Sequence, residues 1–175
     1  MAVVDAVVGD LTRERADALV NAANSALLGG SGVDGALHRA GGPAILAACR
    51  EIRRTTHPDG LPTGDAVATT AGELPAQWLV HTVGPRYGEH AGDEARLLAS
   101  CHTRSLAVAH GLGARSVAFP AISCGVYGYP PHLAAPVAVG AVRSYVEEHP
   151  GAFDSIRFVL VDDRLHALYA AAVAS

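Results

Sequence analysis

The sequence predicts one α/β domain of three layers, with a central sheet between helices. Along the chain, short runs rich in β-branched residues alternate with longer helical segments, which is typical of this class. The 175 residues suit a single domain, and with 50% of them hydrophobic the chain has enough apolar residues for a core of normal size. A glycine-rich stretch also stands between a strand and a helix, at the edge of the sheet where α/β proteins bind ligands.

The expected strands come from apolar, β-branched runs. They span Val3–Val8, Ala18–Val20, Asp65–Thr70, Trp78–Val83, Arg115–Pro120 and Ile156–Val161. The expected helices span Asp34–Ala40, Pro43–Arg54, Glu94–Gly111, a segment that ends near His149, and Arg164–Val173. A short turn is expected over Thr12–Ala16. Pro136 suits the fourth of these helices only near its first turn, because proline lacks the N–H that later turns need.

The composition excludes several classes of protein. All 13 basic residues are arginine, so a Walker-type phosphate loop and a Schiff-base enzyme, which both need lysine, are excluded. The formal charge of −4 leaves no global basic surface for duplex nucleic acid. No segment reads as a signal peptide or approaches the ~20 apolar residues of a membrane span, so we expect no membrane contact. Cys49, Cys101 and Cys124 form neither a disulfide framework nor a zinc motif, and a reducing cytoplasm fits them best.

The most informative stretch is Asn21–Gly42, which follows the second expected strand. It reads NAANSALLGGSGVDGALHRAGG and leads from a strand into a helix. Glycines let a ligand approach the backbone closely, and the N–H groups and dipole of a helix N-terminus attract an anion. The alternative is a flexible surface loop, which would not need Asn21, Asn24 and Asp34 at fixed places around the glycines. The stretch therefore predicts an anion site with polar ends.

A second glycine-containing loop spans Ala121–Pro130 and reads AISCGVYGYP. It stands between a strand and a helix, so it lies at the carboxyl end of a strand, where open sheets bind ligands. The alternative is a tight strand–helix connection plugged by an aromatic side chain.

The first stretch resembles the catalytic loop of macrodomains, most closely that of the MacroD type. The matching residues are Asn21, Ala22, Ala23, Asn24, Ser25, Leu27, Gly29, Gly30, Gly32, Val33, Asp34, Gly35 and His38. Ser31 departs from the family's run of glycines. Shorter similarities occur at Gly9–Thr12, Thr63–Ala66, His81–Pro85 and Ser123–Pro130. The resemblance implies a three-layer α/β/α macrodomain fold over residues 1–175, with a central mixed, mostly parallel sheet.

The resemblance also implies a groove for ADP-ribose. Asp10 would accept a hydrogen bond from the adenine amine and the backbone at Leu11 would meet a ring nitrogen; capping of the next turn is the alternative for Asp10. Asp162 is expected at the same end, after Val161, where many relatives have an aromatic residue. The second loop would wrap the diphosphate, and Tyr127 would cover the distal ribose. The other expected binding residues are Asn21, Ala22, Gly30, Ser31, Gly32, Val33, Ser123, Cys124, Gly125, Val126 and Gly128.

The MacroD-type reaction removes ADP-ribose from acidic side chains of proteins by hydrolysis of an ester at the distal ribose. Asn24 is expected to bind the ribose hydroxyls, and Asp34 to orient the ribose and a water or to act as general base. A substrate phosphate is the alternative activator of the water, and attack on the anomeric carbon or on the ester carbonyl are both open. O-acetyl-ADP-ribose, which has a similar ester, is a second expected substrate. His38 and His81 are expected to be structural, and a catalytic role is the alternative for His38.

Two other functions compete with this one. A non-enzymatic ADP-ribose reader would not need Asn24 and Asp34, so their presence favours an enzyme. A nicotinamide-dependent dehydrogenase needs GxGxxG after its first strand, which ends here in GDLT. Zinc-dependent macrodomains carry Cys and His around the first loop, and residues 21–37 contain neither, so we expect no metal and no other cofactor. We also expect a monomer, and ADP-ribosylated nucleic-acid ends are an open substrate class beside ADP-ribosylated proteins.

Cys124 lies among glycines just before a helix. Because backbone N–H groups and a helix dipole stabilise a thiolate, this position predicts a lowered thiol pKa. An oxidised Cys124 would then repel a diphosphate and switch the site off. The alternative, an inert buried thiol that fills space, is the interpretation that we favour.

Overall fold

A computed structural model describes residues 1–175, which form one six-stranded sheet with helices on both faces. The strands are β1 (Val3–Val8), β2 (Ala18–Ala23), β3 (Ala66–Thr70), β4 (Trp78–Val83), β5 (Ser116–Phe119) and β6 (Ser155–Leu160). Their order across the sheet is β1-β6-β5-β2-β4-β3, and only the edge strand β3 runs antiparallel to its neighbour. The predicted three-layer fold with a mixed, mostly parallel sheet is confirmed.

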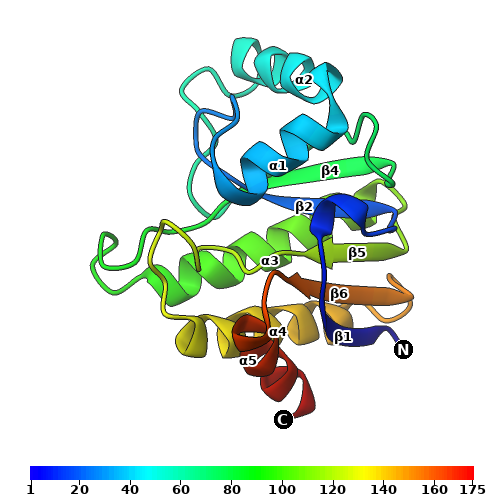
Figure 1. The fold of residues 1–175 in the computed structure, drawn as a ribbon, viewed down its shortest axis with the longest axis vertical. Coiled ribbons are helices and arrows are strands. Elements are labelled where there is room, and N and C mark those ends of the chain that lie inside the picture. Colours follow the sequence, from blue (N-terminus) through cyan, green and yellow to red (C-terminus); the bar gives the residue numbers. More distant parts are fainter.

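The helices are α1 (Gly32–Gly41), α2 (Pro43–Arg54), α3 (Glu94–Gly111), α4 (Pro131–Glu148) and α5 (Asp163–Ala174), with a short 3₁₀ helix η1 (Leu11–Arg13). The helices α3, α4 and α5 pack on one face of the sheet, around a core that includes Phe119 and Phe158. The helices α1 and α2 cover the other face, where Leu37 and Ile45 are fully buried (Figure 1). No helix combines the length and the apolar character that crossing a membrane requires.

The strand β2 is longer than the sequence predicts. It continues through Asn21 to Ala23, because these residues pair in register with His81 to Val83 of β4. Asn21 is therefore a strand residue with its side chain buried, whereas we expected it to begin the loop. The loop proper starts at Asn24.

Two other expectations differ more clearly from the structure, while the bounds of the remaining elements agree with it to within two residues. The turn expected over Thr12–Ala16 is the 3₁₀ helix η1, which begins one residue earlier because Asp10 accepts a hydrogen bond from the Thr12 N–H. Pro136 is the sixth residue of α4, one turn deeper than we expected. A proline there leaves the carbonyl of His132 without its usual helical donor.

The sheet order brings the loops together. In a parallel sheet the carboxyl ends of neighbouring strands share one edge, and β6, β5, β2 and β4 are successive neighbours. The first glycine loop follows β2 and the second follows β5, so the two loops lie side by side although about 100 residues separate them in the chain. The site is therefore expected at this edge.

Candidate functional site

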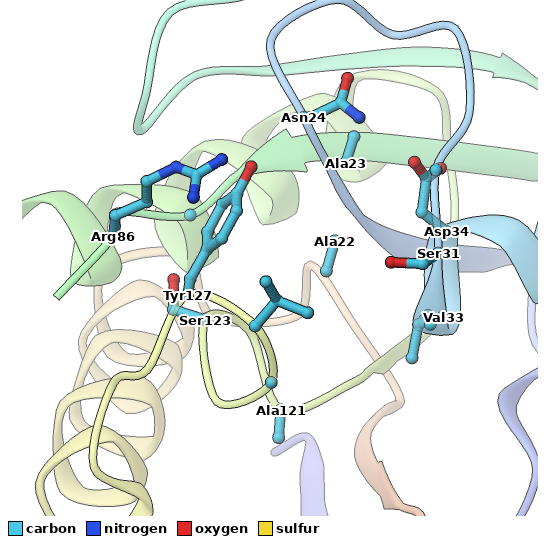
Figure 2. Close-up of a pocket in the computed structure, with 15 residues that line it drawn as sticks. Ala22, Ala23, Asn24, Ser31, Val33, Asp34, Arg86, Ala121, Ser123 and Tyr127 are labelled. Carbon is cyan, nitrogen blue, oxygen red and sulfur yellow. The ribbon is translucent and has the colours of Figure 1, made fainter.

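One cavity of about 360 Å³ lies between the two glycine loops (Figure 2). Of the predicted site residues, it is lined by Ala22, Asn24, Gly30, Ser31, Gly32, Val33, Asp34, Ser123, Gly125, Val126 and Tyr127. Four lining residues are not among those predicted: Ala23, Gly84, Arg86 and Ala121. The structure thus brings both loops to one cavity.

Backbone N–H groups without protein partners surround this cavity on two sides. On one side they belong to the start of α1, at Ser31, Gly32, Val33 and Asp34. On the other side they belong to the second loop, at Ser123, Gly125, Val126 and Tyr127. Unpaired N–H groups beside a helix N-terminus form a binding site for phosphate groups without any lysine.

Gly30 separates the two polar side chains of greatest chemical interest. A Cβ atom at Gly30 would lie 3.0 Å from Asp34 Oδ2 and 3.3 Å from Asn24 Nδ2. Only glycine leaves this space open for a ligand, since any side chain would fill it. The Asn24 amide donates to Gly29 O at 3.1 Å, while its Oδ1 has no partner in the protein. That oxygen is buried, and no protein group uses its capacity to accept a hydrogen bond.

Asp34 is held from below by a buried chain of hydrogen bonds. Asn21 Nδ2 donates to Asp34 Oδ1 at 2.8 Å and lies 3.0 Å from His81 Nδ1. On the far side of the ring, His81 Nε2 lies 2.9 Å from Thr69 Oγ1, whose own proton goes to Thr70 O. We therefore assign the proton of neutral His81 to Nε2, which leaves Nδ1 as the acceptor for Asn21.

This chain of hydrogen bonds revises two expectations. Asn21 does not line the cavity; its buried side chain lies beneath it and donates to Asp34. His81 is buried in β4 as expected, but it is hydrogen-bonded on both ring nitrogens and does more than fill space. Because the two residues meet only through the pairing of β2 with β4, no local pattern reveals their contact.

Burial controls the charges in this network. It raises the pKa of Asp34 above its ordinary value, and the hydrogen bond from Asn21 and the nearby His38 ring oppose that rise. Burial lowers the pKa of His81 to about 3, with a smaller contribution from His38. His81 is therefore neutral at physiological pH, which its acceptor role toward Asn21 requires. A carboxylate with a raised pKa in a cavity is typical of a general base.

His38 lies one helical turn after Asp34, and its Nε2 is 3.4 Å from Asp34 Oδ1. The ring does not line the cavity. This placement fits the structural role expected for His38, as a neighbour that steadies the carboxylate.

Three predicted residues lie outside the cavity, at the end near β1 and β6. Asp10 accepts from the Thr12 N–H and hydroxyl through Oδ1, and these hydrogen bonds hold the pKa of its carboxyl below the ordinary value. The Leu11 side chain is buried in the core, but its N–H has no partner. Asp162 caps α5 by accepting from the Leu165 N–H at 2.9 Å. Both carboxylates thus have structural roles, and each keeps one oxygen for a ligand.

Cys124 contradicts the prediction of a reactive thiol. Its side chain packs against the core, with Sγ 3.9 Å from the Tyr169 hydroxyl, and burial raises the pKa of the thiol instead of lowering it. The backbone N–H of Cys124 bonds to Ala121 O, and that of Gly128 to Gly125 O, so neither is free for a phosphate. The favoured interpretation, a thiol that fills space, fits this environment.

Arg86 is the main functional candidate that the sequence analysis missed. Its guanidinium lies over the Tyr127 ring, 4.5 Å from the ring centre. It follows β4 in the segment that includes Gly84, and the Tyr87 N–H bonds to Tyr127 O at 2.9 Å. Arg86 follows shortly after a strand whose carboxyl end lies at the predicted site. This position is a signal that could have revealed it. No group of three or more His, Cys, Asp or Glu side chains has the arrangement of a metal site.

Known proteins with similar sequences and folds share this architecture. Residues 20–138 match the family model described as Macro domain. The chain is 46% identical over 173 residues to a Klebsiella pneumoniae protein named O-acetyl-ADP-ribose deacetylase, covering 98% of this chain and 96% of that one. The Oceanobacillus iheyensis macrodomain with ADP has a TM-score of 0.92 and 39% identity, covering 97% and 88% of the two chains. The Trypanosoma brucei macrodomain in complex with ADP-ribose has a TM-score of 0.87 and 38% identity, covering 97% and 68%.

Proposed function

The chain belongs to the Macro domain family, and from this premise we propose that it binds ADP-ribose and hydrolyses esters of the distal ribose. The substrates are mono-ADP-ribose on acidic side chains of proteins and O-acetyl-ADP-ribose. Water cleaves the ester, so free ADP-ribose and a carboxylic acid leave the site.

The observation that carries the proposal is the pair of facing N–H arrays. Ser31 to Asp34 on one side and the second loop on the other offer donors to a diphosphate, with no cationic side chain needed between them. The relatives support the choice of ligand, since one is named for O-acetyl-ADP-ribose and another holds ADP-ribose. A diphosphate held here places a sugar toward Asn24 and Asp34.

Asn24 and Asp34 supply the chemistry in this proposal. The Asn24 side chain turns so that its unpaired Oδ1 accepts from a ribose hydroxyl. Asp34 Oδ2, on the other side of Gly30, orients the ribose and accepts a proton from the attacking water. The Tyr127 ring covers the distal ribose. Ser31, which caps α1 without a side-chain hydrogen bond, adds a free hydroxyl beside Asp34.

The decisive assay offers the protein two esters and follows free ADP-ribose. One substrate is a peptide with mono-ADP-ribose on a glutamate, and the other is O-acetyl-ADP-ribose. Calorimetry with ADP-ribose runs in parallel. Release from both substrates supports the proposal, whereas tight binding without release from either one would identify a reader of ADP-ribose.

We predict that Asp10→Asn weakens ADP-ribose binding about ten- to hundredfold by calorimetry, because a hydrogen bond to a charged acceptor contributes about 1.5–3 kcal/mol. Asparagine keeps the oxygen that caps η1 at Thr12 but turns an N–H toward the adenine amine. The variant therefore separates the ligand role from the cap. Asp59→Asn, in an exposed turn, is the matched control. Equal affinities in both variants would remove Asp10 from the binding site.

A further inference from the structure

A second cavity of about 570 Å³ adjoins the first one. The two cavities share four lining residues, Asn24, Gly84, Arg86 and Tyr127, so they form one continuous depression with these residues at the boundary. The boundary is also the place where the proposed reaction occurs, because Asn24 and Tyr127 contact the distal ribose in the proposed function. Whatever is attached to that ribose leaves the first cavity at this point.

Most of the residues that line the second cavity are polar. Ser25 and Thr63 contribute hydroxyl groups that make no hydrogen bond within the protein. Glu89 and His90 contribute charged or ionisable groups. Such a lining fits peptide groups and polar side chains, whereas an acetyl group is far too small to occupy it.

Arg86 makes the second cavity suited to a negatively charged group of a ligand. The Tyr127 ring fixes one face of the guanidinium, and Glu89 Oε2 stands 3.8 Å from its Nε, which is beyond hydrogen-bond distance. Arg86 therefore forms an ion pair with Glu89 but no hydrogen bond with it, and 57% of the Arg86 side chain is exposed, so its N–H groups are open to a further acceptor. A guanidinium that is held in place with free donors is suited to a carboxylate, which it binds through two parallel hydrogen bonds.

We propose that the second cavity binds the polypeptide around the modified residue, and that Arg86 pairs with an acidic side chain next to the ester. This inference rests on the proposed function and extends it to the choice of protein target. It assigns two parts of the depression to two parts of the substrate: ADP-ribose to the first cavity and an acidic peptide to the second. O-acetyl-ADP-ribose would use the first cavity alone.

The test measures binding, so that it does not depend on turnover. The probes are free ADP-ribose and two peptides that carry ADP-ribose through a non-hydrolysable link, one with aspartates beside the link and one with serines. For the native protein we expect the acidic peptide to bind about tenfold more tightly than ADP-ribose, as one charge-assisted pair allows. The affinity of the serine peptide should exceed that of ADP-ribose by a smaller factor.

Thr63 lines only the second cavity, so Thr63→Trp places its bulk there without replacing a residue that lines the first one. We expect it to abolish the gain from the acidic peptide while the affinity for ADP-ribose and the rate on O-acetyl-ADP-ribose stay within about twofold. Thr56→Trp, at an exposed threonine outside both cavities, is the matched control and should keep the gain. If Thr63→Trp does not fold, Ala26→Trp fills the same cavity from another wall.

Arg86→Gln tests the charge. It should remove the difference between the aspartate and serine peptides. If the native protein binds ADP-ribose but neither peptide binds more tightly, or if Thr63→Trp keeps the full gain, the second cavity is not a peptide site. Failure of the native protein to bind ADP-ribose at all would instead refute the proposed function, so the two failures are distinct.

Discussion

Replacing Asp34 by asparagine should slow hydrolysis of both ribose esters about 10²- to 10⁴-fold, the usual contribution of a positioned acid–base group. The affinity for ADP-ribose should change far less, because asparagine has the same shape and the N–H arrays are untouched. The measurements are kcat on both substrates and calorimetry with ADP-ribose. Full activity in Asp34→Asn would show that a phosphate of the substrate activates the water instead.

The same substitution should stabilise the fold at neutral pH. Because burial raises the pKa of Asp34, the folded state favours its protonated form. The stability from this preference is fully present below the pKa of an unfolded aspartate and is lost as the pH rises through the folded pKa. At neutral pH the ionised carboxylate therefore destabilises the folded state, and a neutral amide removes this destabilisation.

Thermal unfolding at two pH values measures this effect. At pH 8 the Tm of Asp34→Asn should exceed that of the native protein, with each kcal/mol gained equal to about 2–4 °C for a domain of this size. At pH 4 the difference should shrink. Asp59→Asn, in an exposed turn, should show no such pH-dependent gain. A lower Tm for Asp34→Asn at pH 8 would contradict the argument.

Local patterns were sufficient for much of the fold. The apolar run at Trp78–Val83 and the proline that opens α2 define their elements because each signal lies within the element itself. Asn24 and Asp34 were also recognisable, since both stand in one contiguous motif around Gly30. The glycine spacing was informative because no side chain fits between the two polar groups.

Other features depend on residues that are far apart in the sequence. The extension of β2 through Ala23 arises from pairing with β4, and the Asn21–His81 contact arises from the same register across 60 residues. Arg86 becomes part of the site only because Tyr127 lies beneath it. The glycines around Cys124 suggested an activated thiol, but the packing of Tyr169 against it determines its environment. In each case a tertiary contact outweighs the local pattern.

The Asn21–His81 contact leads to the second large effect. Replacing Asn21 by leucine, a side chain of similar size, removes the amide that donates to Asp34 and to His81. A hydrogen bond to a charged group is worth about 1.5–3 kcal/mol, so its loss should raise the pKa of Asp34 further. Leaving His81 Nδ1 buried without a donor costs about 1–3 kcal/mol more in stability.

Asn21→Leu should therefore need a higher pH than the native protein to reach its full rate, because the general base must be ionised. A pH profile of kcat measures how far the rise in kcat on the acidic side moves to higher pH. Urea unfolding measures the loss of stability. Thr82→Val is the control: it removes a partly buried hydrogen bond of β4, from Thr82 Oγ1 to Asp65 O at 2.8 Å, that does not involve Asp34. The control should lose stability, while its rise in kcat stays at the same pH as in the native protein. If the rise in kcat of Asn21→Leu also stays at the same pH, Asn21 only supports the fold and does not affect the pKa of the proposed base.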